Sequence, residues 1–232
     1  MKNRLMISFK LKITAVLFSV VIFACVSAIN SYGKKTAEPV SNQRIDELDE
    51  MDFVEMLNSV DVGSASSLIQ KFQNKEARSR LIKGKYDAKK DNKVTVESFR
   101  NKEVLLITIP ASYLFDPNMT TLKEGAADYL SPIERYLKDP DMYRVLLVMH
   151  TDNTGSEVYR ENITFDRVNS VFDWYENRGL DTTYLFSYYL SDEMPLKPNN
   201  TMENRDKNRR LEIYLVPGKK MVEQAQKGKI TF

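Results

Sequence analysis

Residues 143–156 of this 232-residue chain read YRVLLVMHTDNTGS. The run from Tyr143 to Met149 is almost wholly apolar and predicts a buried strand. Polar residues follow it, and Gly155 allows a tight turn whose backbone N–H groups can point at an anion. Open sheets place ligand groups just past the ends of their strands. We therefore expect Asp152 to lie in a binding site.

Strand and helix patterns alternate on both sides of this segment. The apolar patterns predict further strands at residues 94–96, 104–109, 184–189 and 211–216. One helix is expected over residues 120–138, with a kink or a break at Pro132. Another is expected between an N-cap at Thr164 and a C-cap at Gly179, and a short one precedes the last strand. This order predicts an α+β domain with helices packed on a mixed sheet, in which the direction of the last pairing stays open.

Asp152 and Arg167 are the two charged residues that we expect to face each other across a small cleft. Asp152 follows a strand, and Arg167 lies about one turn into its helix if Thr164 is the N-cap. Such a pair suits a zwitterionic ligand, because the carboxylate takes an ammonium group and the guanidinium takes a carboxylate with two hydrogen bonds. From the residues alone, a structural ion pair that holds the loop to the helix is the favoured alternative.

Composition excludes several classes of function. With one Cys and one His, the chain cannot form an internal disulfide, a Cys-based zinc site or a His-rich metal centre. Beyond residue 28 there are 30 basic and 32 acidic residues, so bulk charge gives no reason to expect nucleic-acid binding. The residue types of a catalytic triad occur together at His150, Asp152 and Ser156, but nothing in the sequence indicates the arrangement that a triad needs. We predict a protein that is not an enzyme and that holds no metal and no cofactor.

Residues 1–28 have the pattern of an export segment. Four basic residues precede the apolar run 13–28, whose 16 residues fall short of the ~20 that a membrane-spanning helix needs. Three fates stay open: cleavage after Ala28, lipidation at Cys25 within a partial lipobox, and an uncleaved anchor. Each of them takes the protein out of the cytoplasm.

The rest of the chain divides into three parts. Residues 29–92 are expected to form a linker and a helical extension, with helices near 44–60 and 65–83. Residues 93–217 form the domain that carries the binding site, and residues 218–232 form a basic, mobile tail. The extension carries no recognisable chemistry, although residues 44–90 could contact another envelope protein. The sequence does not indicate an oligomeric state.

Four motifs, in order, resemble those of the OmpA-like (outer membrane protein A-like) peptidoglycan-binding domains. The resemblance covers residues 100–217, about half the chain. Its motifs are Leu114-Phe115-Asp116 followed by Leu122-Lys123, the HTDNTG of residues 150–155, Ile163-Thr164-x-x-Arg167, and Arg205-x-x-Asn208-Arg209-Arg210-x-Glu212-Ile213.

The resemblance implies a non-catalytic protein that binds the diaminopimelate of the peptidoglycan peptide stem. Asp152 and Arg167, 15 positions apart, match the two main ligand residues of the family. A supporting role is expected for Thr154, Gly155, Ser156, Arg160, Thr164 and Arg210. The protein would then lie in the periplasm of a Gram-negative envelope, associated with the outer membrane and the cell wall.

Two alternatives remain beside this interpretation. One is a scaffold or interaction module of the same fold that has lost the ligand, and the other is an envelope enzyme such as a wall hydrolase. The first is motivated by departures from the family pattern. Arg160 stands where the family usually has Asn, and Tyr189 and Ser191 stand where Gly is expected.

Overall fold

The computed structural model describes residues 47–76, 79–82, 86 and 93–232. The chain divides into two compact units, Met1–Asp52 and Phe53–Phe232, and the second unit contains the whole sheet. The predictions for the export segment, for Cys25 and for the first part of the linker lie outside the described residues. None of the described helices is long and apolar enough to cross a membrane.

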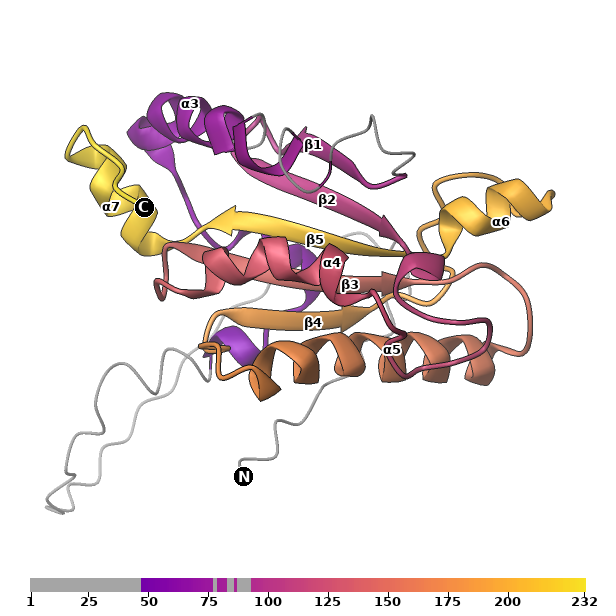
Figure 1. The fold of residues 1–232 in the computed structure, drawn as a ribbon. Coiled ribbons are helices and arrows are strands. Elements are labelled where there is room, and N and C mark those ends of the chain that lie inside the picture. Colours follow the sequence, from indigo (N-terminus) through magenta and orange to yellow (C-terminus); the bar gives the residue numbers. More distant parts are fainter. Residues whose placement is uncertain (1–46, 77–78, 83–85, 87–92) are drawn as a thin grey trace, which may run out of the picture. The chain divides into compact units, whose positions relative to one another are not determined.

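A five-stranded sheet with the order β1-β2-β5-β3-β4 forms the centre of the second unit (Figure 1). All five strands predicted from the sequence are present. Strand β5 runs antiparallel to both β2 and β3, whereas β3 and β4 are parallel, which settles the direction of the last pairing. The strands are β1 (Thr95–Phe99), β2 (Val104–Pro110), β3 (Tyr143–His150), β4 (Leu185–Tyr189) and β5 (Arg210–Pro217).

Strands β3 and β5 are buried at every residue because both faces of the sheet are covered. Their side chains alternate between the faces, and the register pairs Val145 with Leu215 and Leu147 with Ile213. These four residues point to the face that holds the main hydrophobic core. The mixed sheet with packed helices that the sequence predicts is confirmed.

The core face is covered by α4 (Ala127–Leu130), the 3₁₀ helix η5 (Ser131–Leu137) and α5 (Glu157–Asn177). We expected one helix over residues 120–138 with a kink or break at Pro132. Pro132 does break it, because it stands in the first turn of η5, where its missing N–H costs no hydrogen bond. Before Ala127 the chain forms turns, so the helical part is shorter than expected.

Helix α5 begins two turns earlier than the sequence suggested. Its N-cap is Ser156, whose hydroxyl accepts the N–H of Tyr159 at 3.2 Å. The prediction that Thr164 caps this helix is wrong, since Thr164 lies inside it and donates its hydroxyl to the carbonyl of Arg160 at 2.8 Å. The end at Gly179 is confirmed, with a φ of +71° and its N–H bonded to Glu176.

The short helix of residues 53–58 packs on the second face of the sheet. Helix α2 (Phe53–Asn58) places the ring of Phe53 5.7 Å from that of Tyr188 and 5.2 Å from that of Tyr214. Arg144 of β3 donates a hydrogen bond to Ser59. We expected a helix over residues 44–60, but among the described residues α2 is short and residues 51–52 before it are not helical.

The C-terminal residues form a helix that packs on the unit, where we expected a mobile tail. Helix α7 (Lys219–Gln226) buries Met221, Val222 and Ala225 and lies beside α3 (Ser66–Glu76) (Figure 1). The ring of Phe232 then stacks on Tyr136 at 5.8 Å. We expected a mobile tail because residues 218–232 contain four lysines, and this charge outweighed the apolar stripe on one side of the helix in our prediction.

Candidate functional site

Asp152 lies just past the end of β3, as expected, and is only 1% exposed. Its Oδ1 accepts the N–H of Thr154 at 2.8 Å and also the Thr154 hydroxyl, and its Oδ2 accepts a hydrogen bond from Nη1 of Arg209. Burial alone would raise the pKa of Asp152. The donors of Thr154 and Arg209 outweigh that effect and hold the pKa below its ordinary value, so the carboxylate is charged at neutral pH.

Gly155 shapes the turn that holds Asp152. It has a φ of +85°, and a Cβ at this position would lie 2.6 Å from the ring of Tyr159. Arg160 fixes the same turn from the side, because its Nη1 donates to the carbonyl of Gly155 at 2.7 Å. The Nε of Arg160 donates to Asp192 at 2.8 Å. Its positive charge is therefore paired with Asp192, and the side chain joins the turn to the loop after β4.

Arg167 lies in the third turn of α5 rather than the first, ten residues after Glu157. Its Nε donates to the carbonyl of Met119 at 2.8 Å and its Nη2 to that of Asp116 at 3.3 Å. The guanidinium lies over the ring of Phe115, 4.9 Å from the ring centre. Its Nη1 makes no hydrogen bond with any described residue. This atom is the donor that Arg167 can offer to a ligand.

Arg209 completes the site, although from the sequence we assigned the supporting role to its neighbour Arg210. Arg209 donates to Asp152 through Nη1 and pairs through Nη2 with Asp206. Burial lowers the pKa of Arg167, Tyr159 opposes this effect, and the charge of Arg209 adds a smaller lowering. The structural ion pair expected between Asp152 and Arg167 is not among the described salt bridges, because Asp152 pairs with Arg209 instead.

Arg210, which we expected in a supporting role, lies in a different cluster. It is buried, and its Nε donates to Glu212 at 2.7 Å while its Nη2 donates to the carbonyl of Met194 at 3.0 Å. Glu212 also accepts from Tyr214 at 2.7 Å and contacts His150 at 3.2 Å. Arg210 therefore supports the loop after β4 and does not contact Asp152.

The alternation of side chains along a strand could have separated the two arginines. Arg209 shares its parity with Leu211 and Ile213, which face the main core and α5. Arg210 shares its parity with Glu212 and Tyr214, which face the other way. Once β5 is placed, a period of two assigns Arg209 to the side of the sheet on which α5 lies.

The two departures after β4 each have defined contacts in the structure. The ring of Tyr189 packs edge-on against Phe165 of α5, with 5.4 Å between ring centres. Ser191 adopts a φ of +47°, a conformation that favours glycine, and its carbonyl accepts the N–H of Thr151 at 2.8 Å. The backbone thus keeps a glycine-like turn at Ser191 and carries some strain there.

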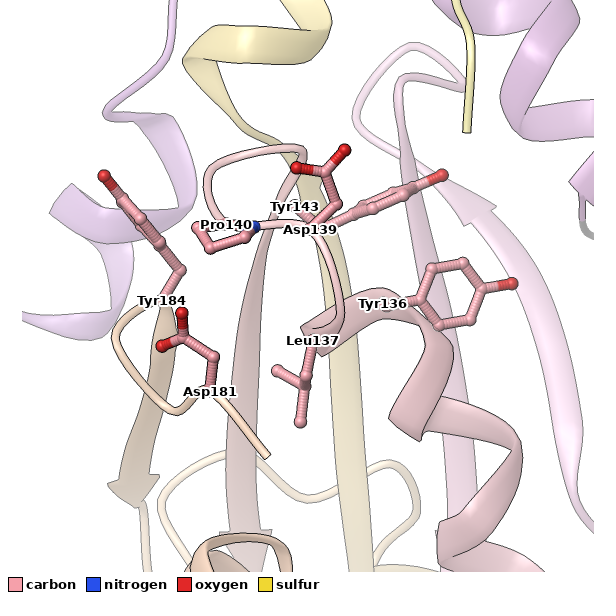
Figure 2. Close-up of a pocket in the computed structure, with 7 residues that line it drawn as sticks. All are labelled: Tyr136, Leu137, Asp139, Pro140, Tyr143, Asp181 and Tyr184. Carbon is pink, nitrogen blue, oxygen red and sulfur yellow. The ribbon is translucent and has the colours of Figure 1, made fainter. Parts of the chain in front are cut away.

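A concave region lies at the end of β3 opposite to Asp152 (Figure 2). Its two acids already have partners, because Asp139 pairs with Lys220 and Asp181 accepts the N–H of Thr183 at 2.9 Å. No group of His, Cys, Asp or Glu in the described part of the chain is arranged to hold a metal ion. The region is lined by Tyr136, Leu137, Asp139, Pro140, Tyr143, Asp181 and Tyr184.

Residues 114–209 match the sequence model of the OmpA family. The chain contains a domain of the OmpA family. This domain resembles the Mycobacterium tuberculosis protein named "Peptidoglycan-binding protein ArfA", which is 36% identical over 91 residues, 38% of this chain and 28% of that protein. It also resembles the Escherichia coli protein named "Probable lipoprotein YiaD", 28% identical over 118 residues, 51% of this chain and 54% of that protein. The chain spans little more than half the length of YiaD.

Two solved structures share the architecture of the OmpA-family domain. The cell wall anchor of the T6SS from Pseudomonas aeruginosa superposes with a TM-score of 0.51 at 26% identity, covering 60% of this chain and 99% of that chain. A MotB-like protein from Desulfovibrio vulgaris gives a TM-score of 0.57 at 19% identity, covering 66% of this chain and 98% of that chain. The latter likeness concerns the fold alone.

Proposed function

We propose that the OmpA-family domain binds peptidoglycan without catalysis and anchors the envelope to the cell wall. The names of two similar proteins support the proposal, one a peptidoglycan-binding protein and the other a cell wall anchor. The protein would act in the periplasm, in association with the outer membrane. The name of the lipoprotein relative is consistent with that location.

The observation that carries the proposal is the arrangement of charge past the end of β3. The buried carboxylate of Asp152 forms an ion pair with Arg209, and the charge of Arg209 contributes to the lowered pKa of Arg167. The Nη1 of Arg167 has no partner among the described residues. A ligand that carries an ammonium and a carboxylate close together matches this arrangement.

Diaminopimelate in the peptide stem has such an end. Its ammonium group would bind Asp152 and its second carboxylate would bind Arg167. A stem with lysine at the same position has the ammonium and lacks the carboxylate, which would leave Nη1 of Arg167 without an acceptor. The proposed ligand is therefore the diaminopimelate-type stem, and the lysine-type stem is the discriminating comparison.

Co-sedimentation with purified diaminopimelate-type sacculi tests the proposal. Asp152→Ala and Arg167→Ala are each expected to weaken sacculus binding about tenfold or more, because each removes a charged hydrogen-bond partner of the ligand. Lys207→Ala is the matched control. Lys207 lies on α6 (Met202–Asn208), where it pairs with Glu203 at 2.7 Å, and its loss should leave binding unchanged.

Two results would reject the proposal in different ways. Failure of the wild-type protein to sediment with sacculi would leave the fold without this function. Release of soluble muropeptides by the wild-type protein would instead point to the envelope-enzyme alternative.

One observation favours a second candidate, a scaffold module on the same fold. Asp152 is 1% exposed and both of its carboxylate oxygens accept hydrogen bonds, from Thr154 and Arg209, so the carboxylate is closed to solvent in this structure. Sacculus binding that is unaffected by Asp152→Ala would favour this candidate. Residues 44–90 would then be the first place to seek a contact with another envelope protein.

A further inference from the structure

Asp152 is closed by a side chain that is itself able to move. The carboxylate is 1% exposed, and its Oδ2 is bonded to Arg209, whose side chain is 30% exposed. The Oδ1 belongs to the turn, where Thr154 supplies both a backbone and a side-chain donor. Arg209 is therefore the partly exposed side chain whose displacement would open Asp152 to an incoming ammonium.

Both backbone polar groups of Arg209 are hydrogen-bonded, so we expect its side chain to move and its backbone to stay in place. Its N–H donates to the carbonyl of Arg205 at 3.0 Å, and its carbonyl accepts the N–H of Ala111 at 2.9 Å. The side chain has a second anionic partner in Asp206, which is 61% exposed and lies in the last turn of α6. Arg209 can leave Asp152 and still be paired with Asp206.

Arg209 and Arg167 can together offer hydrogen-bond donors to an anion. Burial lowers the pKa of Arg167 most, and the like charge of Arg209 adds a smaller lowering. The Nη1 of Arg167 has no acceptor among the described residues. A carboxylate between the two guanidiniums would offset their like charge and accept hydrogen bonds from both side chains.

We propose that Arg209 is a specificity-determining residue and that the ligand displaces its side chain from Asp152. The ligand's ammonium takes the place of the guanidinium at Asp152, and the ligand's carboxylate pairs with the displaced Arg209 as well as with Arg167. This inference rests on the proposed function and deepens it. A zwitterionic ligand gives Asp152 a new cation and gives the displaced Arg209 a new anion. A ligand with an ammonium alone gives Arg209 no new anion, so Arg209 then has only Asp206.

Two tripeptides test the exchange, L-Ala-γ-D-Glu-meso-diaminopimelate and L-Ala-γ-D-Glu-L-Lys. The measured quantity is the ratio of their Kd values, lysine peptide over diaminopimelate peptide, by calorimetric titration of the full chain. Arg209→Ala opens Asp152 and removes one carboxylate partner, so the ratio is expected to fall about tenfold. Lys207→Ala removes one positive charge from the same helix without touching the site, and it should leave the ratio unchanged.

Asp206→Asn provides a second test with the opposite sign. The residue is exposed, so the variant is expected to fold. Without Asp206 a displaced Arg209 depends on the ligand's carboxylate, which penalises the lysine peptide more. The ratio is therefore expected to rise about threefold.

The outcomes separate this inference from the proposed function. Opposite changes of the ratio in Arg209→Ala and Asp206→Asn support the exchange. A wild-type protein that prefers the diaminopimelate peptide by the same ratio as both variants overturns the exchange and leaves the proposed function standing. A wild-type protein that binds neither peptide overturns both.

Discussion

Two arginines that are neighbours in the sequence, Arg209 and Arg210, pair with carboxylates on opposite sides of the same sheet. Arg209 reaches Asp152 beside α5, shares its charge with the exposed Asp206, and is partly open to solvent. Arg210 reaches Glu212, is buried, and lies in a cluster with His150 and Tyr214. Both pairs use residues next to the end of β3 and the start of β5.

The comparison shows how one motif supplies two kinds of ion pair. Both members of the Arg210–Glu212 pair are buried, so removing one of them leaves an uncompensated charge in the interior. The Arg209–Asp152 pair has Asp206 and solvent as alternatives for the arginine. We infer that Arg210–Glu212 maintains the fold, and that Arg209–Asp152 is exchangeable and belongs to binding. The predictions below measure this difference through the free energy of unfolding.

The largest effect is expected for Glu212→Gln. This change leaves the buried Arg210 without its anion and should lower the free energy of unfolding by about 3 kcal/mol. Urea denaturation of the variant beside wild type measures the loss. A loss as small as that of an exposed ion pair would remove the contrast between the two arginines.

The cluster around Glu212 should also make the free energy of unfolding depend on pH in acid. Burial would raise the pKa of Glu212, but its bonds to His150, Arg210 and Tyr214 outweigh burial and lower it from 4.5 to about 2. A carboxyl with a depressed pKa stabilises the fold above its unfolded pKa, and this stability is lost as the pH falls from about 4.5 toward about 2. The free energy of unfolding from urea titrations should fall by ~2 kcal/mol in wild type between pH 5 and pH 3, and should fall less in Glu212→Gln.

His150 acts in the same direction. Burial lowers its pKa, and this outweighs the opposing effect of its bond to Glu212. The unfolded chain therefore takes up the His150 proton more readily, and stability declines as the pH falls below the ordinary histidine value. Equal acid sensitivity of wild type and Glu212→Gln below pH 4.5 would contradict the assignment to Glu212.

Asp152→Asn should cost less than Glu212→Gln. The amide keeps an acceptor for Thr154, and Arg209 retains Asp206, so a loss of about 1 kcal/mol is expected. The same denaturation series measures it. A loss equal to that of Glu212→Gln would show that the Arg209–Asp152 pair is as structural as the pair on the other face.

The smallest effect is expected for Arg160→Asn, which introduces the residue usual in the family. It removes the partly exposed pair with Asp192 and the bond to Gly155, worth about 0.5 kcal/mol of stability. Sacculus affinity should change less than threefold, because Arg160 fixes the turn from outside and its charge is already paired. A loss of affinity as large as that of Arg167→Ala would instead make Arg160 a ligand contact.

Much of the fold could be predicted because its signals are local. The strand periodicity, the break at Pro132 and the C-cap at Gly179 each depend on residues close in sequence. The start of α5 was missed because its first turns carry exposed residues such as Val158 and Tyr159, which hide the helical pattern. The partner of Asp152 was missed because Arg209 reaches it across 57 residues, which only the pairing of β3 with β5 brings together.

The most direct test is an NMR titration of the protein with the diaminopimelate tripeptide, which locates the ligand on the sheet. We predict the largest changes of chemical shift in the turn 152–156 and at the side-chain Nε–H of Arg167. We also predict a shift at the side-chain Nε–H of Arg209 as that side chain leaves Asp152. Shifts confined to the region of Figure 2, at the other end of β3, would contradict the central claim.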